Sequence, residues 1–204
     1  MLFDDTYRTI EHPSEGIFRD RGSKFLGYAF PIQSETEVKA IVTSLKAEHP
    51  KANHHCWAMR LTPDRAIFKL NDDGEPSGTA GRPILNILLS KDITNVLVVV
   101  VRYFGGTLLG VPGLINAYKM ATEEALTHAV VVEKTVNDVY TISFDYLQMN
   151  DIMRLIKDAD LVILNQQFDN ACSIQLSIRK AQVNQFLGKL DKLNGVKIKY
   201  DHSI

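Results

Sequence analysis

The stretch VLVVVVRYF (residues 96–104) decides the fold, because its six consecutive aliphatic residues cannot all face solvent. A run this short and this rich in β-branched residues is typical of a strand buried on both faces. It is followed by the loop GGTLLGVPG (105–113) and by a segment with apolar residues at helical spacing. A buried strand, a glycine-rich loop and a helix are therefore expected, and the apolar side of the helix carries Leu114, Tyr118, Ala121 and Ala125.

The residues before this strand predict the rest of an N-terminal domain. Alternating apolar residues at 16–20 and 24–30, separated by Arg21-Gly22-Ser23, predict a β-hairpin. Ser34 and Glu37 form a capping box at the start of a helix with an apolar face. The remaining elements expected before residue 96 are strands at 55–61 and 66–70 and a helix at 80–90.

The spacing of apolar residues changes at about residue 136, where a second domain is expected to begin. Its apolar patterns predict the order β-α-β-β-α-β, which is the ferredoxin-like arrangement, with a hairpin turn at Asp169-Asn170. We therefore expect an α+β protein with an N-terminal α/β domain at 1–135 and a ferredoxin-like domain at 136–204.

Composition sets broad limits on function. The chain has 204 residues, of which 45% are hydrophobic and 23% charged, as in ordinary globular proteins. Its net charge of −1 shows no overall basic field, although a local patch would suffice to bind nucleic acid. The longest apolar run is too short for a membrane helix, no signal peptide precedes it, and two distant cysteines form no disulfide framework. A cytoplasmic protein without membrane contact is expected.

The stretch DDGEPSGTAGRP (72–83) is the first candidate site. Asp72, Asp73 and Glu75 could perform acid/base catalysis or hold magnesium through oxygen ligands. Asp-Gly and Glu-Pro are also ordinary loop chemistry, and no histidine or lysine follows at a spacing that indicates a catalytic partner. A structured binding loop is therefore favoured over a catalytic centre.

The glycine-rich loop at 105–113 is the second candidate. Backbone N–H groups at a strand–helix junction, with the positive end of the helix, form a ready anion site. Arg102 could add a bidentate contact to a phosphate. The pattern is neither G-x-G-x-x-G nor a Walker loop, and Gly105-Gly106 could equally allow only a tight turn and close packing.

Two further groups of residues have chemical potential. His54 and Cys56 would share one face of a strand and could bind zinc or act as a thiol nucleophile, but His55 and the other histidines complete no ligand set. No metal site is therefore expected. Near the C-terminus, basic side chains outnumber acidic ones and could meet phosphates, or could form only a solvated sheet face; they include Arg179, Lys180, Lys197 and Lys199.

Three motifs together resemble the IMPACT family of the bacterial YigZ type. They are HHCWA (54–58), DDGEPSGTAGRPIL (72–85) and VVVVRYFGGTLLGVPGLINAY (98–118). The resemblance implies an N-terminal, ribosomal-protein-like α/β two-layer domain and a ferredoxin-like domain similar to domain V of elongation factor G. Both folds recur in proteins that touch RNA or the ribosome, which is an argument from analogy.

The sequence therefore predicts a protein without catalytic residues or cofactors that binds RNA or the ribosome and modulates translation. An enzyme or binder for a phosphorylated ligand, and an adaptor for a protein partner, remain alternatives. The two loops are expected to form one groove, with acids at its rim and donors from the backbone, Arg82 and Arg102. The expected groove residues are Asp72, Asp73, Glu75, Ser77, Gly78, Thr79, Arg82, Arg102, Tyr103, Gly105, Gly106 and Gly110.

Overall fold

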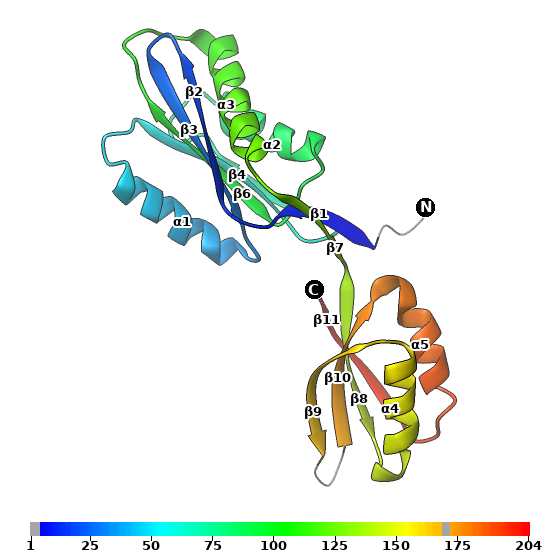
Figure 1. Ribbon diagram of the computed structural model, residues 1–204. Helices are drawn as coiled ribbons and strands as arrows, with labels where there is room; N and C mark the ends of the chain where they lie inside the picture. Colours follow the sequence, from blue (N-terminus) through cyan, green and yellow to red (C-terminus); the bar gives the residue numbers. More distant parts are fainter. Residues whose placement is uncertain (1–4, 169–171) are drawn as a thin grey trace. The chain divides into compact units, whose positions relative to one another are not determined.

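The computed structural model describes residues 5–168 and 172–204 and divides into two compact units (Figure 1). The N-terminal unit comprises Tyr7–Lys134, and the C-terminal unit comprises the residues from Thr135 onward together with Asp5 and Thr6. The sequence places Asp5 in the N-terminal domain. The structure groups it with the C-terminal unit because its carbonyl oxygen accepts a hydrogen bond from the Val136 N–H at 2.6 Å.

An antiparallel five-stranded sheet forms the centre of the N-terminal unit. The strand order is β2-β3-β6-β4-β5, so β6 lies in the middle, where the aliphatic run of residues 96–101 requires it. The predicted hairpin is confirmed as β2 and β3. The strands are β2 (Ser14–Asp20), β3 (Ser23–Pro31), β4 (His54–Leu61), β5 (Ile67–Asn71) and β6 (Val96–Tyr103).

Helices cover both faces of this sheet (Figure 1). Helices α2 (Gly81–Ser90) and α3 (Gly110–Thr127) pack on the face that carries Val98 and Val100. Helix α1 (Glu35–Glu48) packs on the opposite face with Leu97, Val99 and Val101. The unit therefore has three layers, and the two-layer arrangement that the family resemblance implied is wrong, because alternate residues of β6 are apolar in both directions.

The helix starts and faces expected from the sequence are confirmed. The Ser34 N–H donates to the Glu37 carboxylate at 2.9 Å at the start of α1. The predicted inner side of α3 is buried at Leu114, Tyr118, Ala121 and Ala125.

A second, two-stranded sheet consists of β1 (Thr6–Ile10) and β7 (Val131–Thr135). The sequence did not predict it. Four of the five residues of β7 are exposed, so β7 has no alternating apolar pattern, and β1 is only five residues long.

The C-terminal unit is a four-stranded antiparallel sheet with the order β11-β8-β10-β9. This order and the succession β-α-β-β-α-β are those of a ferredoxin-like fold. Short 3₁₀ turns at Tyr146–Gln148 and Lys180–Gln182 precede the helices, and the predicted turn at Asp169-Asn170 lies outside the described residues. The elements are β8 (Asn137–Phe144), α4 (Met149–Asp158), β9 (Val162–Phe168), β10 (Cys172–Arg179), α5 (Val183–Leu190) and β11 (Lys197–Ser203).

Both helices of this unit lie on one face of the sheet (Figure 1). The even-numbered residues of β10 from Cys172 to Ile178 are buried against α4 and α5, while the odd-numbered residues point away from them. The second face of the sheet is covered by no described element of the unit; we call it the open sheet face. Within residues 5–168 and 172–204, no helix has the length and hydropathy needed to cross a bilayer.

Candidate functional site

The three sequence motifs of the N-terminal unit meet at one pocket of about 470 Å³. The pocket lies between the start of β4, the loop before α2, the end of β6 and the start of α3. We call it the α3 pocket. Its polar lining consists of Asn53, His54, Glu75 and Arg102, and its apolar lining of Pro76, Phe104, Leu108, Leu109, Val111 and Leu114, beside Gly110.

A buried charged pair forms one wall of this pocket. The Arg102 Nη1 donates to the Glu75 Oε1 at 2.5 Å, and the side chains are only 7% and 3% exposed. The same Glu75 oxygen accepts a hydrogen bond from the Tyr118 hydroxyl at 2.8 Å. Burial raises the pKa of Tyr118 above its ordinary value, so the hydroxyl keeps its proton and donates. The expectation that Glu75 shapes an exposed rim is wrong, because the carboxylate is needed inside to neutralise Arg102.

Asp72 organises the loop that leads into α2. Its carboxylate accepts hydrogen bonds from the backbone N–H groups of Gly78 at 2.9 Å, Ala80 at 3.2 Å and Gly81 at 2.8 Å. These contacts satisfy donors at the start of a helix and place a negative charge at its positive end. The geometry assigns Asp72 a capping role.

Asp73 ties the same loop to β4 and α1. Its carboxylate accepts from the His55 N–H at 2.6 Å and pairs with Lys46 at 3.1 Å. Its carbonyl oxygen lies 2.8 Å from the Nδ1 of His54. Because a carbonyl can only accept, Nδ1 carries a proton, and Nε2 lies 3.9 Å from the Glu75 Oε1 beside the α3 pocket.

Gly105 allows the glycine-rich loop to pack closely against the backbone of the β2–β3 turn. A Cβ there would lie 1.9 Å from the carbonyl carbon of Gly22 in the β2–β3 turn. Its N–H donates to the Ser23 hydroxyl at 3.1 Å and is therefore engaged within the protein. Gly106 (φ +85°) and Gly110 (φ +70°) have left-handed backbone conformations that favour glycine. Gly110 alone of these three glycines lines the α3 pocket.

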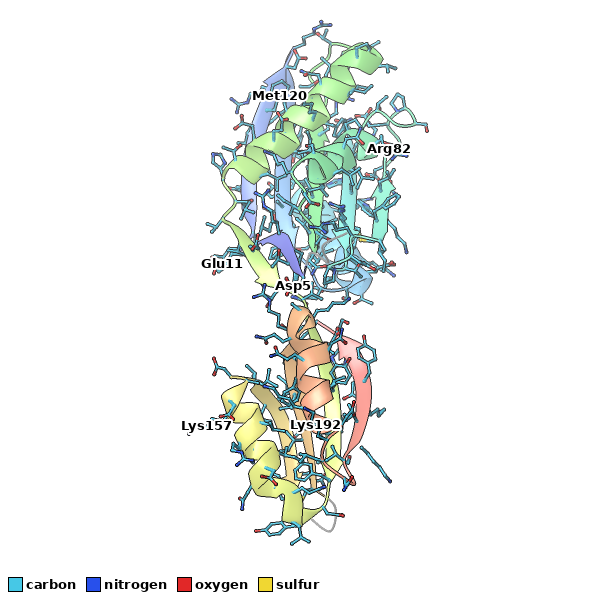
Figure 2. The ribbon with its side chains drawn as sticks, turned by 90° about the vertical axis from the view of Figure 1, so that its right-hand side faces the viewer. Asp5, Glu11, Arg82, Met120, Lys157 and Lys192 are labelled. Carbon is cyan, nitrogen blue, oxygen red and sulfur yellow. The ribbon has the colours of Figure 1, made fainter. Side chains whose placement is uncertain are left out.

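Two of the expected groove residues lie elsewhere. Arg82 is exposed on α2 (Figure 2) and lines a separate pocket with Gly78. Tyr103 follows Arg102 on β6, so it points to the α1 face, where its hydroxyl lies 2.9 Å from His49. Of the remaining expected residues, Ser77 is exposed, and Thr79 is buried with its hydroxyl donating to the Pro76 carbonyl at 2.7 Å.

The zinc and thiol alternatives find little support in the geometry. Within the described part of the chain, no group of three or more His, Cys, Asp or Glu side chains could hold a metal ion. Cys56 is fully buried, and burial raises the pKa of its thiol far above the ordinary value, whereas a nucleophilic cysteine needs a lowered one. Burial also lowers the pKa of His55, which keeps that ring neutral.

Sequence reasoning missed several residues of the pocket. Asn53, which lines the pocket, precedes the HHC motif without a signal of its own. Tyr118 supports the pocket wall from the core through its bond to Glu75, and its place on the apolar side of α3 predicts only a core residue. The Asn53 side-chain oxygen accepts from the Phe104 N–H at 2.8 Å, which connects β4 to the glycine-rich loop.

The four basic residues expected to bind nucleic acid differ in their surroundings. Arg179 is held by Asp5 through two hydrogen bonds of 2.6 and 3.1 Å, so its availability for phosphate is lower than expected. Lys197 and Lys199 are exposed on β11, opposite Ser143 and Thr141 of β8. These register positions place both lysines on the open sheet face.

The remaining basic residues lie apart from this face. The backbone N–H of Lys180 donates to the Val136 carbonyl at 2.9 Å at the start of the 3₁₀ turn that precedes α5. Lys189 belongs to α5, and Lys192, just beyond its end, lies on the helical side of the unit, as does Lys157 of α4 (Figure 2). The basic segment at 179–199 therefore does not form one continuous patch.

Comparison with known proteins identifies the family. Residues 21–126 match the model of the Impact N-terminal domain. The chain is 35% identical to the IMPACT family member YigZ of Escherichia coli K12, over 82% of this chain and 83% of YigZ. One solved structure, described as the crystal structure of a hypothetical protein, is 31% identical to this chain in sequence and has a TM-score of 0.73. The matched region covers 95% of this chain and 96% of the other chain.

A more distant relative carries a functional description. The solved structure of the two-domain translational regulator Yih1 is 30% identical to this chain in sequence and has a TM-score of 0.37. The matched region covers 63% of this chain and 49% of the Yih1 chain. The match to the domain model and the identity to YigZ over most of both chains agree with the motifs at 54–58, 72–85 and 98–118. The chain is a member of the IMPACT family, of the YigZ type.

Proposed function

We propose that this protein binds structured RNA through the open sheet face of its C-terminal unit and thereby modulates translation without catalysing a reaction. The observation that supports this proposal most directly is the composition of that face. Two exposed lysines, Lys197 and Lys199, line its β11 edge, and most of the other side chains are polar and form hydrogen bonds, with Val139 and Val162 as the apolar exceptions. Cations meet phosphates, and uncharged polar groups meet phosphate and ribose oxygens.

The uncharged side chains of the face favour recognition of RNA shape. Strand parity and register place no Phe, Tyr or Trp on the described part of the face. The face therefore lacks the aromatic side chains on which the bases of single-stranded RNA stack. Double-stranded RNA presents phosphates and 2′-hydroxyls across a wide minor groove instead. The polar side chains that the register places on this face are Thr141, Ser143, Asn165, Gln167, Ser173, Gln175 and Ser177.

Asp201 holds part of this face in a fixed arrangement. Its carboxylate accepts hydrogen bonds from the Thr141 hydroxyl at 2.6 Å and the Gln175 amide at 3.0 Å, and these bonds lower its pKa. Asp201 also lies 3.4 Å from the Lys199 ammonium. The face therefore carries a small positive charge, which corresponds to few phosphate contacts and a moderate affinity.

The family relationship supports a role in translation. Yih1, a relative at 30% sequence identity, is described as a translational regulator, and we extend that role to this chain as part of the proposal.

Replacing both Lys197 and Lys199 with glutamine is expected to weaken binding to an RNA hairpin by roughly tenfold at low salt. The slope of log affinity against log salt should become shallower by about 1.5, since each lost phosphate contact removes roughly 0.7 to 0.9. Fluorescence anisotropy with a labelled hairpin, at several salt concentrations, measures both quantities.

A matched control is available on the helical side of the same unit. The double replacement Lys189→Gln/Lys192→Gln removes the same charge from exposed positions and should leave the slope unchanged. Equal losses in both double variants would show that only net charge matters. Absence of hairpin binding by the wild-type protein at low salt would contradict the proposal outright.

A further inference from the structure

We propose that the α3 pocket binds a small organic monocarboxylate with an apolar body. This site belongs to the N-terminal unit and is separate from the RNA-binding face proposed above. Three features of the pocket support it: a buried guanidinium with unused donors, an uncapped helix N-terminus, and apolar walls that are partly exposed.

The guanidinium of Arg102 has more donors than the structure supplies with acceptors. A guanidinium has five N–H donors, and the structure shows one of its nitrogens, Nη1, bonded to Glu75. The buried Nε has no acceptor among the described residues. The side chain is only 7% exposed and lies against the rings of Phe25 and Phe104, at 5.4 and 5.6 Å from their centroids. A buried guanidinium with more donors than acceptors is costly, and because Arg102 lines the pocket, a carboxylate there would add an acceptor for it.

The N-terminus of α3 opens on the same pocket. The helix has 18 residues, and its N-cap residue, Leu109, provides no side-chain hydrogen bond. Gly110 and Val111, at its first two positions, line the pocket. Uncapped N–H groups and the helix dipole together favour a negative charge at this point.

The apolar walls indicate that the ligand has more than a charged head. Leu108 and Val111 line the pocket, yet they are 81% and 51% exposed. A ligand body in contact with Phe104, Leu108 and Val111 would remove this apolar surface from water. The volume of about 470 Å³ is that of a small-molecule site, and the recessed position of Arg102 does not suit a polymer backbone.

The charges in the pocket favour one negative charge on the ligand. Glu75 already neutralises Arg102, so the helix end contributes the remaining positive potential, of about half a unit charge. A phosphate dianion would bring a second negative charge close to the buried Glu75 carboxylate. A carboxylate matches both the charge and the planar geometry of the guanidinium.

Three probes that share a phenyl group test the inference with the full chain. The probes are 3-phenylpropionate, its neutral analogue 3-phenyl-1-propanol, and phenyl phosphate, each titrated at neutral pH and followed by the amide and Arg102 Nε–H signals in NMR spectra. We expect 3-phenylpropionate to shift the signals of Arg102, Gly110 and Val111, and to bind about tenfold more tightly than either other probe.

Two matched variants locate the site without disturbing the fold. Val111→Asp places a negative charge at the mouth of the pocket, where a helix N-terminus tolerates an acid, and should weaken 3-phenylpropionate binding by about tenfold. Ile115→Asp makes the same change on the exposed side of α3, which lines the other pocket, and should alter binding by less than about twofold.

Four results would overturn the inference. One is equal binding of the acid and the alcohol, and another is tighter binding of phenyl phosphate. The third is binding that Val111→Asp leaves intact. The absence of any shift near Arg102 at tens of millimolar acid would be a fourth contradiction, because it would show that the acid does not bind there.

Discussion

Replacing Glu75 with alanine is expected to lower the free energy of unfolding of the N-terminal unit by about 3–5 kcal/mol. The substitution leaves the Arg102 charge buried without its counter-ion, and the Tyr118 hydroxyl loses its acceptor. Urea denaturation followed by the fluorescence of Trp57, the only tryptophan of the chain, reports on this unit directly.

Two controls separate the buried charge from other effects. Glu123→Ala removes a partly exposed carboxylate that lies 4.0 Å from Lys119, and should change stability by less than about 0.5 kcal/mol. The double variant Glu75→Leu/Arg102→Met removes both charges and should recover much of the loss. A loss below about 1 kcal/mol for Glu75→Ala would show that Arg102 is not buried as the structure has it.

Replacing Gly105 with alanine is expected to cost about 3 kcal/mol or more, at the upper end for overpacking. The added Cβ would lie 1.9 Å from the Gly22 carbonyl carbon and 2.2 Å from the Ser23 nitrogen. Both are backbone atoms, so no side chain can rotate away, and the β2–β3 turn would have to separate from the loop. The same denaturation experiment measures the loss.

The neighbouring glycine provides the control. Gly106 has open space around an added Cβ but a φ of +85°, so Gly106→Ala should cost only about 1 kcal/mol from backbone strain. If Gly106→Ala were as harmful as Gly105→Ala, the close approach of the two turns would not be the reason for the glycine pair.

The fold could be predicted wherever local periodicity determines it. The aliphatic run at 96–101 required a central strand, and the patterns after residue 136 indicated a ferredoxin-like order that the strand topology confirms. The third layer of the N-terminal unit was missed, although the apolar face of α1 and the two-sided apolar pattern of β6 both pointed to it.

The site was only partly predictable because its contacts are long-range. Arg102 and Glu75 are 27 positions apart, and Tyr118 is 43 positions from Glu75, so no local pattern shows that the carboxylate points inward. The pairing of Arg179 with Asp5 spans 174 positions. By contrast, strand alternation alone could have separated Tyr103 from Arg102. The sequence could predict that the loops at 72–83 and 105–113 lie together. The roles of their individual residues depend on the tertiary structure.

The central claim is that the open sheet face binds structured RNA, and a map of the bound face tests it most directly. Amide chemical shifts of the full chain would be recorded during titration with an RNA hairpin and with a single strand of equal length. We predict shifts concentrated at Thr141, Gln175, Lys197 and Lys199, with the hairpin bound more tightly. Shifts confined to the N-terminal unit, or no shifts with either RNA, would contradict the account.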